Sequence, residues 1–188
     1  MYGLLNRAIE ELVTERAGRP IWEAVKRKAG VTVPCFVSLE SYPDALTYDL
    51  VAAASEVLGE PTDAILRAFG RHWVLSTARG EFGPLFELAG SSFEAFLGHL
   101  DALHSHLVTS MPELVPPSFT LFWEREGVAR LRYESSREGL APMLVGLVEG
   151  LAELFEIDVR VEHVVTRGAT ADGAAADEFL VTLPTGTA

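Results

Sequence analysis

Apolar residues recur at helical spacing through the first half of the chain, and this pattern predicts a series of helices. The first apolar stripe lies over residues 4–13, and Pro20 is placed to open a second helix. A third helix spans residues 45–58, with Gly59 at its C-terminal stop and Pro61 opening the next helix. We expect that next helix to present on one side Ile65, Leu66, Phe69, His72, Trp73 and Ser76.

One more long helix follows Gly83-Pro84. Ser91-Ser92 supplies hydroxyls that can cap the N-terminus of this helix. Its apolar stripe comprises Phe93, Phe96, Leu97, Leu100, Leu103, His104 and Leu107. The stripe therefore includes one histidine, His104.

Beyond Pro116-Pro117 the hydrophobic period changes from helical to alternating, which is typical of strands. Apolar side chains alternate over residues 119–123, Glu126-Gly127 is a turn signal, and residues 128–133 return as a second strand. This pattern predicts a β-hairpin.

The last third of the chain combines one more amphipathic helix, over residues 140–155, with strand-like segments at 157–165 and 179–183. The Gly- and Ala-rich stretch from Thr166 to Asp177 is typical of a loop. We therefore predict an α+β fold in a single domain over residues 1–188. A helical lobe over about residues 1–60 joins an α+β lobe over about 61–188, which is built around an antiparallel four-stranded sheet.

The charge balance limits the possible partners. Lys and Arg number 15 against 27 Asp and Glu, a formal net charge of −12. We therefore expect neither nucleic acid nor an anionic membrane as a partner, because both require a basic surface. No apolar run approaches the roughly 18 residues of a membrane span, and the N-terminus lacks a signal-peptide layout. These features favour a cytoplasmic protein.

Cys35 is the only cysteine, so this chain alone forms no disulfide, thiolate zinc cluster or iron–sulfur site. Between Pro34 and Phe36, we expect Cys35 to serve as a small buried apolar residue.

Tyr133, Ser135 and Arg137 stand at alternate positions of an extended segment, so their side chains share one face. Two hydroxyls and a guanidinium fork could together hold a ligand with one or two carboxylates. Haem has that character, with two propionates, an apolar ring and an iron that takes an imidazole. The alternative is a strand end that faces solvent, with Arg137 paired to an acidic residue.

Two histidines of the long helix compete for the role of iron ligand. His104 and His106 lie two residues apart, so on a helix their side chains diverge by about 200° and only one can face a given ligand. His104 shares the stripe of Leu100 and Leu107, whereas His106 falls outside it. His104 is therefore the candidate. The alternative is a core histidine bonded to a backbone carbonyl.

Five blocks resemble, in order, the haem-nitric-oxide/oxygen-binding (H-NOX) family, which includes the regulatory domain of soluble guanylate cyclase β subunits. They are residues 1–6, 100–107, 116–119, 133–137 and 139–143. The resemblance covers nearly the whole chain and implies haem b (iron protoporphyrin IX) as cofactor. It implies His104 as the axial ligand of the iron, and Tyr133, Ser135 and Arg137 as the residues that hold the propionates.

The resemblance also assigns residues around the ring. Pro117 and an apolar residue near Leu5 are expected to press on the haem and distort it. Trp73 is similar to a residue of the distal wall, although it could equally be core packing. Family members that hold oxygen stably carry a distal tyrosine, whose position here falls on Met143 or Pro142. Neither of these can donate a hydrogen bond, but the Trp73 indole can.

We therefore expect a non-enzymatic sensor that binds nitric oxide and carbon monoxide but holds no stable oxygen. Because the chain ends at Ala188, we expect it to signal to a separate protein, such as a histidine kinase or a cyclic-nucleotide enzyme. One alternative is a haem enzyme of the peroxidase type, which needs a distal acid or base; His72 beside Trp73 is its candidate. The other is a haem-free domain that binds an apolar ligand or a protein.

Overall fold

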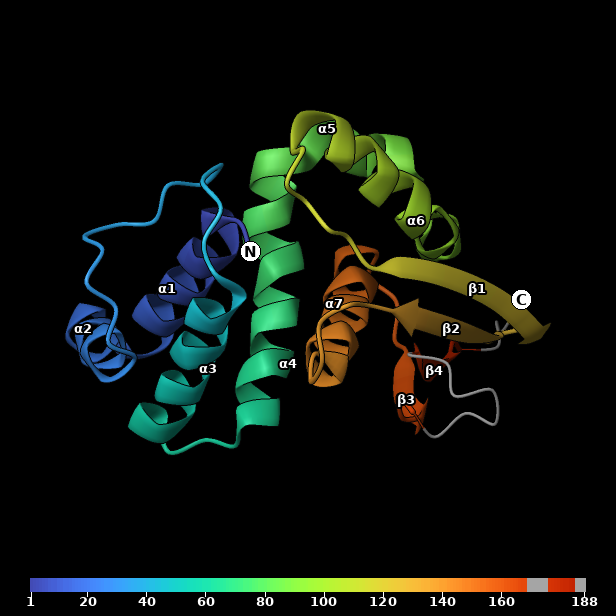
Figure 1. Cartoon of the computed structure of the whole chain (residues 1–188). Coiled ribbons are helices and arrows are strands. Elements are labelled where there is room, and N and C mark those ends of the chain that lie inside the picture. Colours follow the sequence, from blue (N-terminus) through green and yellow to red (C-terminus); the bar gives the residue numbers. More distant parts are fainter. Residues whose placement is uncertain (169–175, 185–188) are drawn as a thin grey trace.

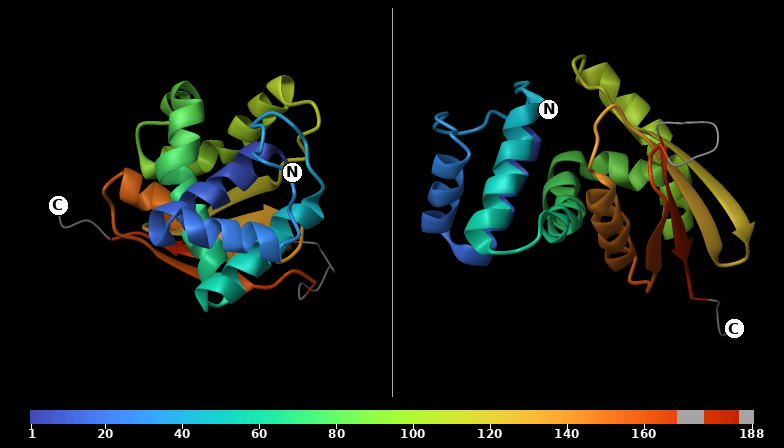
Figure 2. Two further views of the ribbon diagram at one scale, coloured as in Figure 1. Left: turned by 90° about the vertical axis from the view of Figure 1, so that its left-hand side faces the viewer. Right: turned by 60° about the horizontal axis from the view of Figure 1, so that its bottom comes forward.

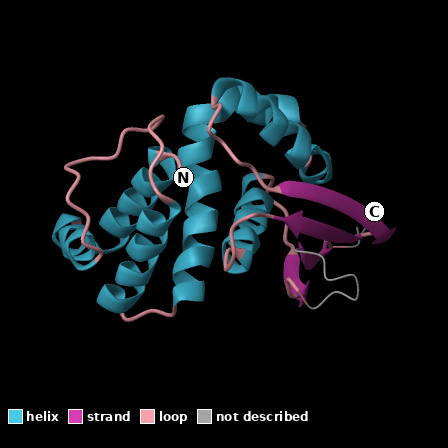
Figure 3. Ribbon diagram, viewed as in Figure 1, coloured by secondary structure: helices cyan, strands magenta, loops and turns pink. Residues whose placement is uncertain are grey.

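The structure, a computed structural model, describes residues 1–168 and 176–184. Its helices are α1 (Gly3–Ala17), α2 (Arg19–Lys28), α3 (Asp44–Leu58), α4 (Thr62–His72), the π-helix η1 (Trp73–Ala78), α5 (Arg79–Ala89), α6 (Phe93–Ser110) and α7 (Ala141–Leu154). Its strands are β1 (Ser118–Arg125), β2 (Val128–Glu134), β3 (Arg160–Val165) and β4 (Ala176–Thr182). The predicted α+β class is confirmed (Figure 3).

The four strands form one antiparallel sheet in the order β1-β2-β4-β3. Leu131 in β2 stands opposite both Leu121 in β1 and Phe179 in β4, so these side chains share a face. That face packs against α6 and α7. The other face carries charged residues, including an ion pair between Arg130 and Glu178. Alternation along the strands thus orients one apolar face toward the helices.

Two hydrophobic clusters lie on either side of α4 (Figures 1 and 2). One surrounds Trp22 and is formed by α1, α2, α3 and the near side of α4. The other is formed by α6, α7 and the inner face of the sheet, and Phe93 and Phe179 are among its fully buried side chains. Ile65 and Phe69 of α4 belong to the first cluster, and the π-helix η1 that continues α4 contributes Val74 to the second. The lobe boundary near residue 60 stays a prediction.

Helices α4 and α7 cross at backbone contact. A Cβ atom on Gly146 would lie 1.9 Å from the carbonyl oxygen of Arg67, and one on Gly70 would lie 2.1 Å from that of Met143. Only glycine permits this approach. On the solvent side, Arg67 pairs with Glu149 through Nε at 2.7 Å. The close crossing fixes α7 against α4.

Residues 73–89 depart from a regular α-helix. Helix α5 runs through Pro84 with a kink at Phe82 (φ −123°, ψ 26°). Pro84 thus falls in the first turn after the kink, where a missing N–H breaks no helical hydrogen bond. The prediction that Ser76 lies on the same side as Ile65 and Phe69 was wrong, because Ser76 is exposed. It belongs to the π-helix η1, in which successive side chains point in other directions than in an α-helix.

The prediction for Cys35 was also wrong, because its side chain is exposed. It lies in the irregular segment between α2 and α3, where its neighbour Phe36 is 4% exposed and packs with Tyr42. Within the described residues, no helix combines the length and apolar character needed to cross a membrane. The predicted loop from Thr166 to Asp177 lies largely outside the described residues, which omit 169–175.

Candidate functional site

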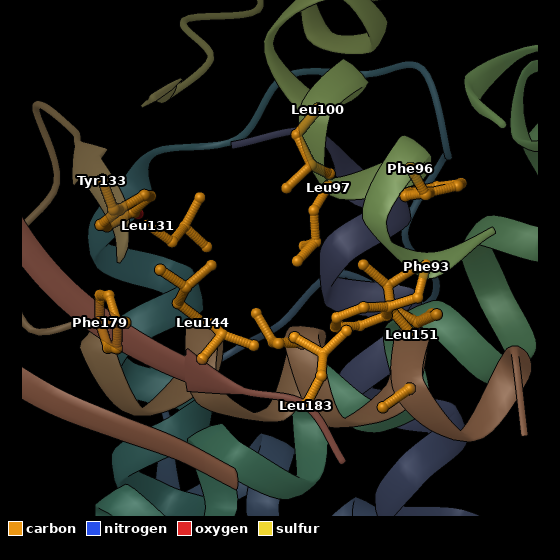
Figure 4. Close-up of a cluster of buried hydrophobic side chains, with 14 of the residues drawn as sticks. Phe93, Phe96, Leu97, Leu100, Leu131, Tyr133, Leu144, Leu151, Phe179 and Leu183 are labelled. Atoms are coloured by element: carbon orange, nitrogen blue, oxygen red, sulfur yellow. The ribbon is translucent and has the colours of Figure 1, made fainter. Parts of the chain in front are cut away.

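A large apolar cavity lies between α6, α7 and the β1–β2 hairpin, and it extends to α1 and η1. It encloses about 1730 Å³ of empty space, part of which is open to solvent. Of the lining residues, Figure 4 labels Leu100 of α6, Leu144 of α7 and Tyr133 of the sheet, which lie on different sides of the cluster. The α7 wall consists of apolar side chains: Met143, Leu144, Leu147, Val148 and Leu151.

His104 lines this cavity from α6, and its ring lies 5.2 Å from the ring of Phe119 on β1. Its Nδ1 donates to the carbonyl oxygen of Leu100 at 2.8 Å, which leaves the Nε2 lone pair available to a metal. Burial lowers the pKa of His104, although the Leu100 carbonyl and Asp101 act against it. The ring is therefore held neutral, as a metal ligand must be.

His106 makes the same kind of bond, from Nδ1 to the carbonyl oxygen of Ala102 at 2.8 Å. It is exposed and lies outside the cavity wall. Burial and position, and not the hydrogen bond, therefore distinguish His104.

Tyr133, Ser135 and Arg137 all line the cavity. Strand β2 ends at Glu134, so Ser135 and Arg137 lie beyond the strand and not on one extended segment as expected. A bend holds them, in which the backbone N–H of Arg137 donates to Ser135 Oγ at 3.0 Å. Burial raises the pKa of Tyr133, and a hydrogen bond with Ser135 partly opposes it. The phenol thus stays protonated and can donate.

The side chain of Arg137 is 19% exposed, and its guanidinium already has partners. Nε donates to Asp44 Oδ2 at 2.8 Å, and Nη1 donates to the carbonyl oxygen of Val115 at 2.7 Å. A longer contact of 3.4 Å joins Nη2 to Asp44 Oδ1. Since a guanidinium has five N–H groups, two remain for a further carboxylate.

Asp44, at the start of α3, was not among the predicted site residues. Partial burial favours the neutral acid, but the N-terminal ammonium of Met1 and the Arg137 guanidinium outweigh it and lower the pKa of Asp44. Tyr48, one helical turn later, donates to the carbonyl oxygen of Glu138 at 2.9 Å. Asp44 lies 93 residues from Arg137 in sequence, and no local pattern could have joined them.

The other predicted site residues, Leu5, Trp73, Pro117 and Met143, also line the cavity. Trp73 is the first residue of η1 and packs against both hydrophobic clusters. Met143 contributes to the wall, whereas the alternative position, Pro142, does not. The sequence therefore predicted which residues meet at one cavity, and their individual roles stay predictions.

His72, the candidate acid or base of a peroxidase, lies outside the cavity wall. Its side chain is buried against α1, with Nδ1 3.6 Å from Glu15 Oε2 and Nε2 3.8 Å from Glu11 Oε2. This placement gives His72 no access to a ligand in the cavity.

The cavity has the chemistry that haem requires. It combines a long apolar wall, one neutral imidazole with an available Nε2, and hydroxyl and guanidinium donors for carboxylates. An α+β fold that encloses such a cavity favours a haem-binding domain as the class of protein.

The chain belongs to the haem-NO-binding family, because the model of that family matches residues 2–163. It is 31% identical over 179 residues to soluble guanylate cyclase gcy-31 of Caenorhabditis elegans, covering 89% of this chain and 26% of that protein. It is 27% identical over 176 residues to soluble guanylate cyclase 89Da of Drosophila melanogaster, covering 93% and 26%. The chain thus spans about a quarter of the length of these relatives. It is a haem-binding gas-sensor domain of the H-NOX type.

Solved structures share the fold at low identity. The H-NOX protein from S. oneidensis in the Fe(II)NO ligation state has a TM-score of 0.86 at 20% identity, over 98% of this chain and 100% of that one. An oxygen-binding H-NOX domain related to soluble guanylate cyclases, in its oxygen complex, has a TM-score of 0.81 at 22% identity, over 100% and 97%. These similarities show that the chain has the H-NOX fold.

Proposed function

We propose that this chain senses nitric oxide through haem b held in the cavity, with His104 as the axial ligand of the iron. One observation carries the proposal: His104 from α6 and the group of Tyr133, Ser135 and Arg137 after β2 line the same apolar cavity. A core histidine or a solvated strand end would not require these two sets to share a cavity.

Each residue has a role that its surroundings support. The hydrogen bond from His104 to Leu100 fixes which ring nitrogen carries the proton, and burial keeps the ring neutral. Arg137 keeps two N–H groups for a propionate, and the protonated Tyr133 can donate to one. Pro117 and Leu5 would pack against the ring from their places in the wall.

When bound, ferrous haem supplies an iron that takes nitric oxide or carbon monoxide as a ligand. Stable oxygen binding needs in addition a hydrogen-bond donor on the wall opposite His104. There, α7 presents Met143 and other apolar side chains, which cannot donate. We therefore propose that the domain excludes stable oxygen binding. The indole of Trp73 is the donor that would contradict this if it reached the ligand.

The output follows from the position of His104 on α6. His104 would tether α6 to the bound haem, so a gas that binds the tethered and untethered arrangements of α6 with different affinities would shift the balance between them. We propose that a partner reads this difference. Our candidate is a separately encoded histidine kinase or cyclic-nucleotide enzyme. The relatives named as soluble guanylate cyclases support the second of these two classes.

The test compares His104→Gly with His106→Gly. We expect wild-type protein supplied with haem to show a Soret band, and His104→Gly to lose the wild-type ferrous spectrum until imidazole is added. His106→Gly should leave the spectrum unchanged. A wild-type ferrous spectrum in His104→Gly without imidazole would exclude His104 as the ligand. A wild-type protein with no Soret band after haem supplementation would exclude haem sensing.

A further inference from the structure

We propose that Arg167 is a positioning residue, which holds the segment bearing Ser135 and Arg137 in its ligand-binding conformation from outside the cavity. Arg167 follows β3 and lies beyond residues 2–163, which match the family model. The inference rests on the proposed function, because it assigns a support to the residues that would hold the propionates.

The geometry centres on one nitrogen atom. Arg167 Nη1 donates to the carbonyl oxygen of Ser135 at 2.8 Å and to that of Arg137 at 3.2 Å. These two carbonyls flank the bend in which the Arg137 N–H donates to Ser135 Oγ. Since β2 ends at Glu134, strand pairing no longer fixes this stretch of backbone. Arg167 supplies charged hydrogen bonds at that point, which are stronger than neutral ones.

Arg167 is itself anchored to the sheet. Its backbone N–H donates to Asp177 Oδ1 at 3.1 Å, and His163 Nε2 lies 2.8 Å from the same oxygen. Asp177 is 13% exposed and stands opposite Tyr133 in the sheet. The ring of His163 stacks on Phe179 at 4.7 Å. Strands β3 and β4 thus fix the point from which the Arg167 side chain reaches the bend.

Arg167 supports the site without entering it. It is not among the residues that line the cavity, whereas Ser135 and Arg137 are. The positive charge of Arg167 nonetheless acts on a residue of the site. Burial raises the pKa of Tyr133, and the positive charges of Arg137 and Arg167 both oppose that rise. Arg167 therefore adds positive potential beside the predicted carboxylate site in a chain of net charge −12.

The experiment replaces Arg167 by Met, which removes the charge at similar length, and by Lys, which keeps donors. The first measurement is the rate of haem transfer to excess apomyoglobin. We expect Arg167→Met to accelerate haem loss about tenfold, the loss expected for charged hydrogen bonds, and Arg167→Lys to restore part of the retention. The control is Arg160→Ala on β3, whose side chain is 75% exposed and pairs with Glu162. It should change the rate less than about twofold.

A double-substitution comparison separates positioning from general stabilisation. If Arg167 acts through the segment of Arg137, Arg167→Met should add little to the faster haem loss of Arg137→Ala. In the His104→Gly background, supplied with imidazole, Arg167→Met should still accelerate haem loss about tenfold. The proposal would be overturned if Arg167→Met multiplied the rate of haem loss by the same factor in the Arg137→Ala background as in the His104→Gly background. It would also be overturned if Arg167→Met alone lost haem at the wild-type rate.

Hydrogen exchange on the haem-free protein tests the same contact without the cofactor. We expect faster exchange at the Arg137 amide in Arg167→Met, with unchanged exchange at Leu131 in the middle of β2. Unchanged exchange at Arg137 would overturn the proposal even if haem loss were faster. If wild-type protein took up no haem, the proposed function would fail, and this exchange measurement would still decide whether Arg167 holds the segment.

Discussion

Substitution of Gly146 by alanine tests whether α4 and α7 must touch at the backbone. A Cβ on Gly146 would lie 1.9 Å from the carbonyl oxygen of Arg67 and 2.8 Å from its carbonyl carbon. Contacts below 3.0 Å essentially do not occur, so the two helices must separate by at least 1.1 Å at this point. The neighbouring pair of Arg67 and Glu149 spans the same crossing.

Two opposing effects determine how much Gly146→Ala changes the free energy of unfolding. Alanine is favoured over glycine inside a helix by about 1 kcal/mol. Overpacking costs about 1–3 kcal/mol and occasionally more; the upper part of this range applies because the overlap is with backbone, which cannot rotate away. We expect Gly146→Ala to lower the free energy of unfolding by about 2 kcal/mol. Urea unfolding of the haem-free protein measures this directly.

Gly98→Ala is the matched control. Gly98 lies in α6, is exposed, and a Cβ there would meet nothing within 4 Å. Only the propensity effect remains, so Gly98→Ala should stabilise the protein by roughly 0.5–1 kcal/mol. Gly150→Ala should lie between the two, since its closest contact would be 3.0 Å. Equal stabilisation by Gly146→Ala and Gly98→Ala would refute the backbone contact.

Two further predictions concern the cavity. Met143→Tyr should raise oxygen affinity if the proposed distal wall is correct, and absorption spectra of the ferrous protein in air would show it; a wild-type protein with a stable oxygen complex would contradict the assignment. The lowered pKa of His104 should make the haem-free protein less stable as pH falls below about 6.5, because the unfolded chain takes up a proton that the buried ring resists. His104→Gln should remove this part of the pH dependence in urea unfolding at pH 7 and 5, whereas His106→Gln should retain it.

Local periodicity was sufficient to predict most of the fold. The cap at Ser92, which accepts from the Ala95 N–H, and the left-handed Gly59 at the end of α3 were both readable from residue type. The region of η1 and α5 was not. A period of 3.6 residues cannot represent a π-helix, so Ser76 was assigned to the wrong face. The kink at Phe82 in α5 likewise leaves no trace in the hydrophobic pattern.

The site was predictable in its members but not in its connections. Helical phase separated His104 from His106, and the structure gives only His104 a place in the cavity wall. The partners of Arg137 could not be predicted, because Asp44 and Val115 belong to segments that only tertiary packing brings to it. Both readings of Arg137 are therefore partly correct: it lines the cavity, and it pairs with an acid.

The two main walls of the cavity differ in how firmly they are held, and this difference matters for a sensor. The α7 wall meets α4 through backbone atoms at Gly146, so any movement there disrupts close packing. The α6 wall is joined to β1 through Asp101, which accepts from the Ser118 hydroxyl at 3.1 Å and the Phe119 N–H at 3.0 Å. Such exposed hydrogen bonds contribute only about 1 kcal/mol each. If His104 binds the iron as proposed, a change at this residue would act first on the end of α6 beyond its buried residues Phe93, Phe96, Leu97 and Leu100, and α7 would be the reference against which the change is read.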